Sequence, residues 1–295
     1  MSILRQSRPA LVTIATLIGV GLVLLAFQAA LGSGGHTAQA RSPEFLAWSA
    51  AASVGVVVYA FVFGRTVRMV RPASRASLAV SLVAYVIVCG FVLAALTGHG
   101  PPGGLDTVRL VMRPLYGVAE IAAAPSVLTV WLVHARLRQV DDTLRRAQPE
   151  GLLTELVSAK ADLGRCLAAL SLIASTGLIN TAVLRKAYLA QGMAPELFPS
   201  TTVLLYGAGL TAIVALIYVP AYLRWRDEAA ELVKAVYPTP ADARPSEDWA
   251  NGRARLRELI GIDVPVSKTL AAAFGILAPL ATSLLSVYLP ELKPG

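Results

Sequence analysis

Charge is scarce in this chain, and the scarcity limits the kind of protein it can be. Charged residues occupy 15% of the 295 positions, hydrophobic residues occupy 56%, and the mean hydropathy is +0.63. Soluble globular chains carry about 25% charged residues. The shortage therefore excludes an ordinary soluble domain and indicates that lipid is the solvent for most of the chain.

Cysteine and histidine are also few. Cys89 and Cys166 both fall in or at the edge of apolar runs, so they predict no disulfide framework. His36 and His99 lie in glycine-rich segments without a close His-x-x-x-His spacing, and we expect no metal site. Lys268 resembles the retinal-binding lysine of the microbial rhodopsins, but a full apolar run follows it, so the lysine lies at a membrane edge and no cofactor is expected.

Apolar runs long enough to cross a bilayer recur along the whole sequence. At about 1.5 Å per residue, a hydrocarbon core about 30 Å thick needs about 20 apolar residues. Seven runs qualify: 10–31, 46–64, 77–97, 115–134, 166–185, 201–223 and 269–289. Each must be a helix, because a lipid-exposed span has to satisfy its own backbone hydrogen bonds. The sequence thus predicts an all-α, polytopic membrane bundle of about seven helices that forms a single transmembrane domain, 1–295.

The basic residues alternate from loop to loop. Of the 26 lysines and arginines, 20 fall on the side that holds the N-terminus. The other side holds Arg41, Arg109, Arg113, Arg185, Lys186 and Lys293. By the positive-inside rule the N-terminus is cytoplasmic and the C-terminus extracytoplasmic, in a multi-pass protein of the cell membrane. The net charge of +8 then indicates contact with anionic inner-leaflet lipid, and the absence of a nucleic-acid motif argues against a nucleic-acid partner.

Two segments leave alternatives open. Residues 1–40 either contain the first span or, because Ala38-Gln39-Ala40 resembles a signal-peptidase site, are removed as a signal peptide. Residues 224–268 form the largest polar segment and are expected to be a cytoplasmic connector broken by Pro238, Pro240 and Pro245.

The start of that connector has apolar residues at helical spacing: Trp225, Ala229, Leu232, Val233 and Val236. It therefore either continues the sixth helix or lies on the membrane surface. Small residues four apart at Ala47, Ala51 and Gly55 form a stripe that packs helices within one chain or between chains, so the oligomeric state stays open.

Glu120 is the residue that most needs an explanation, because it is a carboxylate inside a predicted span. Counted along the helix, it lies about 8 Å below the outer boundary of the hydrocarbon, at about the depth of Asn180, while Gln28 lies about 5 Å deep. Tyr206 also falls in the outer half of its span. We therefore expect an outward-facing polar site made of Glu120, Asn180, Gln28 and Tyr206.

Two arginines, Arg113 and Arg185, are candidate counter-charges for Glu120. Pro125 lacks an N–H, so it leaves the carbonyl of Ile121 without its intrahelical partner beside the glutamate. Two interpretations remain: Glu120 binds an ion or proton, or it is a structural acid bonded to Asn180 or a tyrosine.

Three classes of function are compatible with such a site. The first is a channel, transporter or exporter for a small solute, proton or cation. The second is a membrane sensor, assembly or immunity protein. The third is a membrane-embedded enzyme that acts on a lipid or isoprenoid, although no second carboxylate or Ser-His pair falls at the depth of Glu120. Whether the chain is an enzyme is left open by its sequence.

Overall fold

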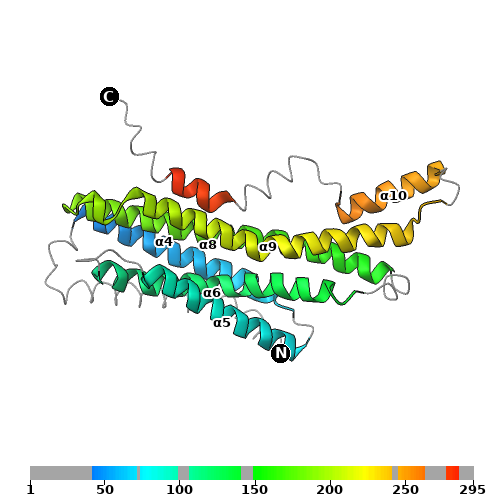
Figure 1. Cartoon of the computed structure of the whole chain (residues 1–295), viewed down its shortest axis with the longest axis horizontal. Helices are drawn as coiled ribbons and strands as arrows, with labels where there is room; N and C mark the ends of the chain where they lie inside the picture. Colours follow the sequence, from blue (N-terminus) through cyan, green and yellow to red (C-terminus); the bar gives the residue numbers. More distant parts are fainter. Residues whose placement is uncertain are drawn as a thin grey trace, which may run out of the picture.

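The computed structural model describes residues 42–71, 74–98, 106–140, 149–240, 245–262 and 277–285. These residues are helical almost throughout, and the part described contains no strand (Figure 1). The elements are α4 (Pro43–Thr66), η1 (Val67–Met69), α5 (Arg75–Gly98), α6 (Asp106–Leu137), α8 (Pro149–Ala190), η2 (Pro195–Leu197), α9 (Ser200–Val236) and α10 (Glu247–Ile260). Residues 277–285 add one further helical segment. The predicted all-α class is confirmed.

Five helices are long and apolar enough to cross a membrane, as a multi-pass membrane protein requires. They cover Pro43–Met69, Arg75–Val92, Leu115–Leu137, Glu150–Ala190 and Pro195–Val236. These ranges contain or overlap the second to sixth runs of the sequence. The run at 10–31, and all of the run at 269–289 except residues 277–285, lie outside the described residues.

Helix α5 shows what kind of surface these helices present. Its exposed side chains are large and apolar, among them Val80, Val83, Ile87 and Phe91, and 76% of Phe91 is exposed. Water-soluble proteins rarely expose a continuous apolar surface of this kind. Among the described helices α5 packs chiefly against α6, so most of its surface is not covered by these helices and can face hydrocarbon.

Helices α8 and α9 are longer than a bilayer is thick. Their 42 and 37 residues correspond to about 63 Å and about 55 Å of helix, against about 30 Å of hydrocarbon. The sequence predicted spans of 166–185 and 201–223, so each helix continues well beyond its apolar run.

The extensions of the two helices persist because they bury apolar residues against each other. Leu152 and Leu156 of α8 and Leu232 and Val233 of α9 are all buried in one cluster, and Ile260 of α10 joins them. The expected connector 224–268 therefore begins with the last turns of α9 and contains helix α10.

The two ends of the bundle are held in different ways. At one end, called the turn end, α8 passes through η2 into α9, and Gln191 Nε2 donates a hydrogen bond of 3.2 Å to Oγ of Ser42, the N-cap of α4. Gly192 takes a positive φ of 86° in this turn, a conformation that suits glycine. At the other end, the α10 end, η1 packs on α6, Met69 of η1 joins the buried cluster that holds the extensions of α8 and α9, and α10 packs on these extensions.

Helices α4 and α8 approach each other closely near the middle of α4. A Cβ atom placed on Gly55 would lie 2.5 Å from Nδ2 of Asn180, so only glycine fits without a shift. This contact fixes the position of Tyr59, one turn along α4. Tyr59 faces the interior of the bundle, where the candidate site lies.

Candidate functional site

A cavity of about 160 Å³ lies among α4, α5, α6, α8 and α9. Most of its lining is aliphatic. The polar lining residues are Tyr59, Tyr85, Cys89, Tyr116, Glu120, Thr181 and Tyr206. Within the described part of the lining, Glu120 is the one charged residue. A cavity that is apolar with a few convergent polar groups is typical of ligand sites in proteins.

Helical spacing explains why these residues meet. Helix α6 contributes Tyr116, Glu120, Ala123 and Val127, which follow one another at intervals of three or four residues. Residues at that spacing share one face of a helix. Helix α9 does the same with Tyr206, Leu210, Ile213 and Ile217, so both helices turn a continuous stripe towards the cavity.

Among the described residues, the carboxylate of Glu120 has no ion-pair partner. Its Oε1 atom is buried, and no residue in the described ranges forms a hydrogen bond with it. The backbone carbonyl of Glu120, in contrast, accepts a hydrogen bond of 2.5 Å from the hydroxyl of Tyr85 on α5. The backbone at this point is thus tied to α5, while the side chain is left for something that the cavity can hold.

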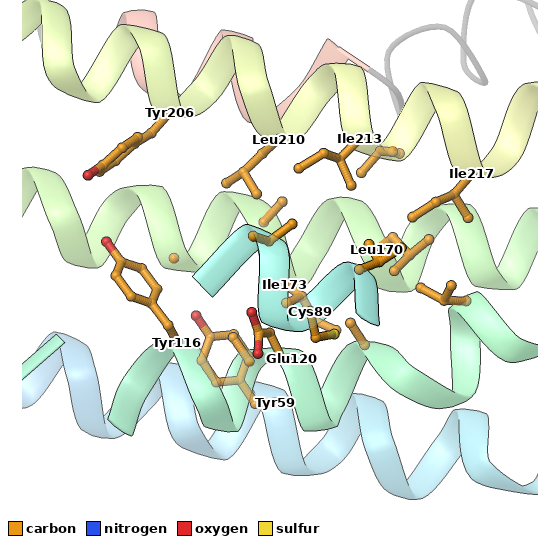
Figure 2. A pocket seen from close by; sticks show the side chains of 18 of the residues that line it. Tyr59, Cys89, Tyr116, Glu120, Leu170, Ile173, Tyr206, Leu210, Ile213 and Ile217 are labelled. Carbon is orange, nitrogen blue, oxygen red and sulfur yellow. The ribbon is translucent and has the colours of Figure 1, made fainter. Parts of the chain in front are cut away.

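The cavity has a polar end and an apolar end (Figure 2). Tyr206 from α9 and Tyr116 from α6 point towards each other, and Tyr59 and Glu120 lie beside them. Tyr59, Tyr116 and Tyr206 come from α4, α6 and α9, and all three line this end of the cavity. Further along, the walls are formed by aliphatic side chains: Leu170, Leu210, Ile213 and Ile217.

The structure places the residues of the predicted site in three locations. Glu120 and Tyr206 both line the cavity. Asn180 is 1% exposed and packs between α8 and α4, beside Tyr59 but behind the cavity wall. Arg185 lies in the turn end, where its Nε donates a hydrogen bond of 2.7 Å to the carbonyl of Phe198. Arg113 belongs to α6, but its side chain lies outside the described residues. The whole of Gln28 also lies outside them.

Several lining residues were not singled out from the sequence. Tyr59, Tyr116, Cys89 and Thr181 are neutral, and such residues are common in spans for packing alone, so neither charge nor depth distinguishes them. The signal that was available is spacing, since Tyr116 precedes Glu120 by four residues and therefore shares its face. The grouping with Tyr59 on α4 depends on tertiary packing.

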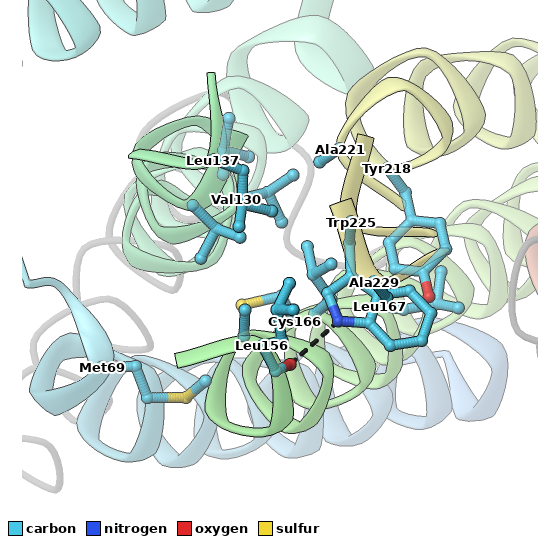
Figure 3. Close-up of a cluster of buried hydrophobic side chains, with 14 of the residues drawn as sticks. Met69, Val130, Leu137, Leu156, Cys166, Leu167, Tyr218, Ala221, Trp225 and Ala229 are labelled. Carbon is cyan, nitrogen blue, oxygen red and sulfur yellow. Dashed lines mark hydrogen bonds between the residues drawn. The ribbon is translucent and has the colours of Figure 1, made fainter. Parts of the chain in front are cut away.

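The ionisable residues elsewhere in the described ranges do not form a comparable site. No group of three or more His, Cys, Asp and Glu residues is arranged there to hold a metal ion. At the α10 end, Glu228 is 1% exposed and forms an ion pair of 2.6 Å with Arg224. The Trp225 indole N–H donates a hydrogen bond of 2.9 Å to the carbonyl of Leu156 (Figure 3). The carboxylate of Glu228 is thus paired, whereas Oε1 of Glu120 has no partner among the described residues.

No protein-family model, curated protein or solved structure matches this chain. The cavity and the unpaired carboxylate in its wall are therefore the features of the chain that bear on its function.

Proposed function

We propose that the chain is a transport protein of the cell membrane that exchanges a cation for protons at Glu120. The observation that carries the proposal is the buried Oε1 atom without a hydrogen-bond partner among the described residues. An ionised carboxylate in such apolar surroundings is costly unless a positive charge accompanies it. Glu120 therefore holds either a proton or a cation.

The cation and the proton compete for one carboxylate, and this competition couples the movement of the cation to that of the proton. When a cation enters the cavity, Glu120 must release its proton, and when the cation leaves, a proton must return. Binding of the cation then strengthens as the pH rises, because the proton competes for the same oxygen atoms. A single unpaired carboxylate is sufficient for this coupling, without a second titrating group.

Helix α5 is the element best suited to open the cavity. It supplies part of the wall through Val88, Cys89 and Val92, yet it packs chiefly on α6. The main core joins chiefly α6, α8 and α9, so a displacement of α5 withdraws Tyr85 from that core and leaves the contacts among the other three helices in place. Pro125 follows Glu120 by about one turn and removes one backbone hydrogen bond of α6. This loss favours bending of the helix at the site.

The distribution of charge supports an orientation for this transport. Arg65, Arg68, Arg136 and Arg138 lie at the α10 end, together with the extensions of α8 and α9. The positive-inside rule then puts the α10 end in the cytoplasm and the turn end outside. A sensor or a lipid enzyme would also need a cavity, but an enzyme of that kind needs a second acid or base, and the described lining holds one carboxylate.

The test is cation-driven loss of a proton gradient in proteoliposomes. Purified full-length protein is reconstituted with a pH gradient, and Na⁺, K⁺, tetramethylammonium and benzyltrimethylammonium are added in turn. Quaternary ions are chosen because they have no free base that crosses the bilayer alone. We expect at least one cation to dissipate the gradient, more strongly at higher pH. Glu120→Gln should abolish this response, because the amide keeps the size but cannot ionise.

The control is Glu196→Gln, which removes an exposed carboxylate in η2 and should leave the response unchanged. Both variants are first checked for a wild-type melting temperature in detergent. If no cation in the series dissipates the gradient faster than protein-free liposomes, or if a folded Glu120→Gln variant responds fully, the exchange proposal is wrong.

A further inference from the structure

We infer that the cation is a monovalent organic ammonium carrying one apolar group about the size of an aromatic ring. This inference rests on the proposed exchange and adds the chemical class of the substrate. The ammonium would lie at the polar end of the cavity, between Glu120 and the rings of Tyr59, Tyr116 and Tyr206. The apolar group would extend along Leu170, Leu210, Ile213 and Ile217.

The ligands that the cavity offers argue against an inorganic cation. Ca²⁺ takes six to eight oxygen ligands and Mg²⁺ takes six, as general rules for hard cations. The described lining offers one carboxylate, the hydroxyls of four tyrosines and that of Thr181, spread over five helices, and otherwise carbon and the Cys89 sulfur. A dehydrated metal ion would thus lack most of its ligands. An alkylated ammonium ion needs few, because carbon atoms cover most of its surface.

The aromatic rings supply the attraction that an organic ammonium requires. A cation within about 6 Å of an aromatic ring is attracted by the negative face of the ring, and aromatic cages are a recurring way to bind quaternary ammonium groups. Tyr59, Tyr116 and Tyr206 come from three different helices and line the same end of the cavity (Figure 2). The carboxylate of Glu120 belongs to the same end and supplies the negative charge that an ammonium ion requires.

The apolar end and the volume define the remainder of the ligand. Cavities of about 150 Å³ lined by aliphatic residues hold one benzene molecule. The volume here is about 160 Å³, most of it bordered by aliphatic side chains. A benzyl or similar group fits that space. One carboxylate also balances one charge, so the ligand is monovalent.

The test measures direct binding of benzyltrimethylammonium to the purified full chain in lipid nanodiscs. The radiolabelled cation is displaced by unlabelled benzyltrimethylammonium, by tetramethylammonium, and by neopentylbenzene, which has the same shape with carbon in place of nitrogen. We expect tetramethylammonium to bind at least tenfold more weakly, because it leaves the apolar end empty. Neopentylbenzene should also be at least tenfold weaker, because it has no charge for Glu120.

Substitutions separate the charge from the rings. Glu120→Gln should weaken binding of the cation at least tenfold and leave that of neopentylbenzene within about threefold. The Tyr116→Phe variant keeps the ring, and its affinity for the cation should stay within about threefold of the wild-type value. The Tyr116→Leu variant lacks the ring, and its affinity for the cation should be at least fivefold weaker. Glu196→Gln serves again as the control with unchanged binding, and every variant is required to match the melting temperature of the wild type within a few degrees.

The outcomes separate this inference from the exchange on which it rests. If Na⁺ or K⁺ dissipates the proton gradient through Glu120 while benzyltrimethylammonium does not bind, the substrate class is wrong and the exchange stands. If neopentylbenzene displaces the label as well as the cation does, the cavity selects a neutral apolar ligand and the inference is overturned. If the cation binds through Glu120 but no cation in the series dissipates the gradient, the substrate class is supported and the transport proposal fails.

Discussion

The cavity and the α10 end of the bundle hold a carboxylate in opposite ways. Glu228, in the extension of α9, is paired with Arg224 at 2.6 Å in a densely packed cluster. Glu120 lies in a cavity, and its buried Oε1 has no partner among the described residues. A paired carboxylate contributes to the stability of the folded chain, whereas an unpaired one in a cavity is available for a ligand. The comparison teaches that burial alone does not identify a site; an unpaired carboxylate in the wall of a cavity does.

The largest effect we expect concerns which side of the membrane each end faces. In a background with Cys89→Ala and Cys166→Ala, single substitutions Glu196→Cys at the turn end and Glu247→Cys on α10 are compared in intact cells. An impermeant maleimide should label the first and leave the second unlabelled until the cells are opened, because the basic loops put α10 in the cytoplasm. Labelling of Glu247→Cys from outside would reverse the orientation on which the direction of transport rests.

The same substitution at both carboxylates tests the comparison directly. Glu228→Leu should lower the free energy of unfolding by about 2–3 kcal/mol, because it leaves the Arg224 guanidinium without its ion-pair partner. Glu120→Leu should stay within about 1 kcal/mol of wild type or stabilise the chain, since it replaces an unpaired carboxylate by a hydrocarbon side chain. Unfolding in mixed detergent micelles measures both values, and an equal loss at the two positions would show that Glu120 has a structural partner after all.

A smaller effect is expected from the indole at the α10 end. Trp225→Phe removes the hydrogen bond to the Leu156 carbonyl and part of a ring that is 1% exposed, so we expect a loss of about 1–2 kcal/mol. Trp249→Phe is the matched control, because this indole is half-buried on α10 and its loss should be within about 0.5 kcal/mol. If the two variants are equally stable, the extension of α8 and α9 is packed more loosely than the structure shows.

The sequence predicts most of the helices because their signal is local. Five of the seven apolar runs coincide with helices long enough to cross a membrane, and run length alone is enough to find them. The extensions of α8 and α9 are harder to see, since Arg224, Arg226 and Asp227 make that part of α9 resemble a loop. The spacing of Trp225, Ala229 and Leu232 did allow a continued helix, whereas the early start of α8 was not predicted.

The site is predictable in part for a similar reason. Glu120 stands out because a carboxylate within a span is rare, and the structure places it in the wall of a cavity. The rings of Tyr59 and Tyr116 do not stand out, because a tyrosine in a span is unremarkable until the neighbouring helices are placed. What joins them is the packing of α4 against α8 at Gly55, which involves residues more than a hundred positions apart and leaves no local pattern.

The bond from Tyr85 to the Glu120 carbonyl has a consequence for the timescale of ligand exchange. This hydrogen bond links α5 to α6 beside the cavity. A single bond of this kind contributes about 1 kcal/mol. Helix displacements against such small barriers occur within microseconds to milliseconds. Under the proposed exchange, opening of α5 is therefore expected within this range of times. The slow step is then expected to be the loss of the ligand's hydration shell before the ligand meets the carboxylate.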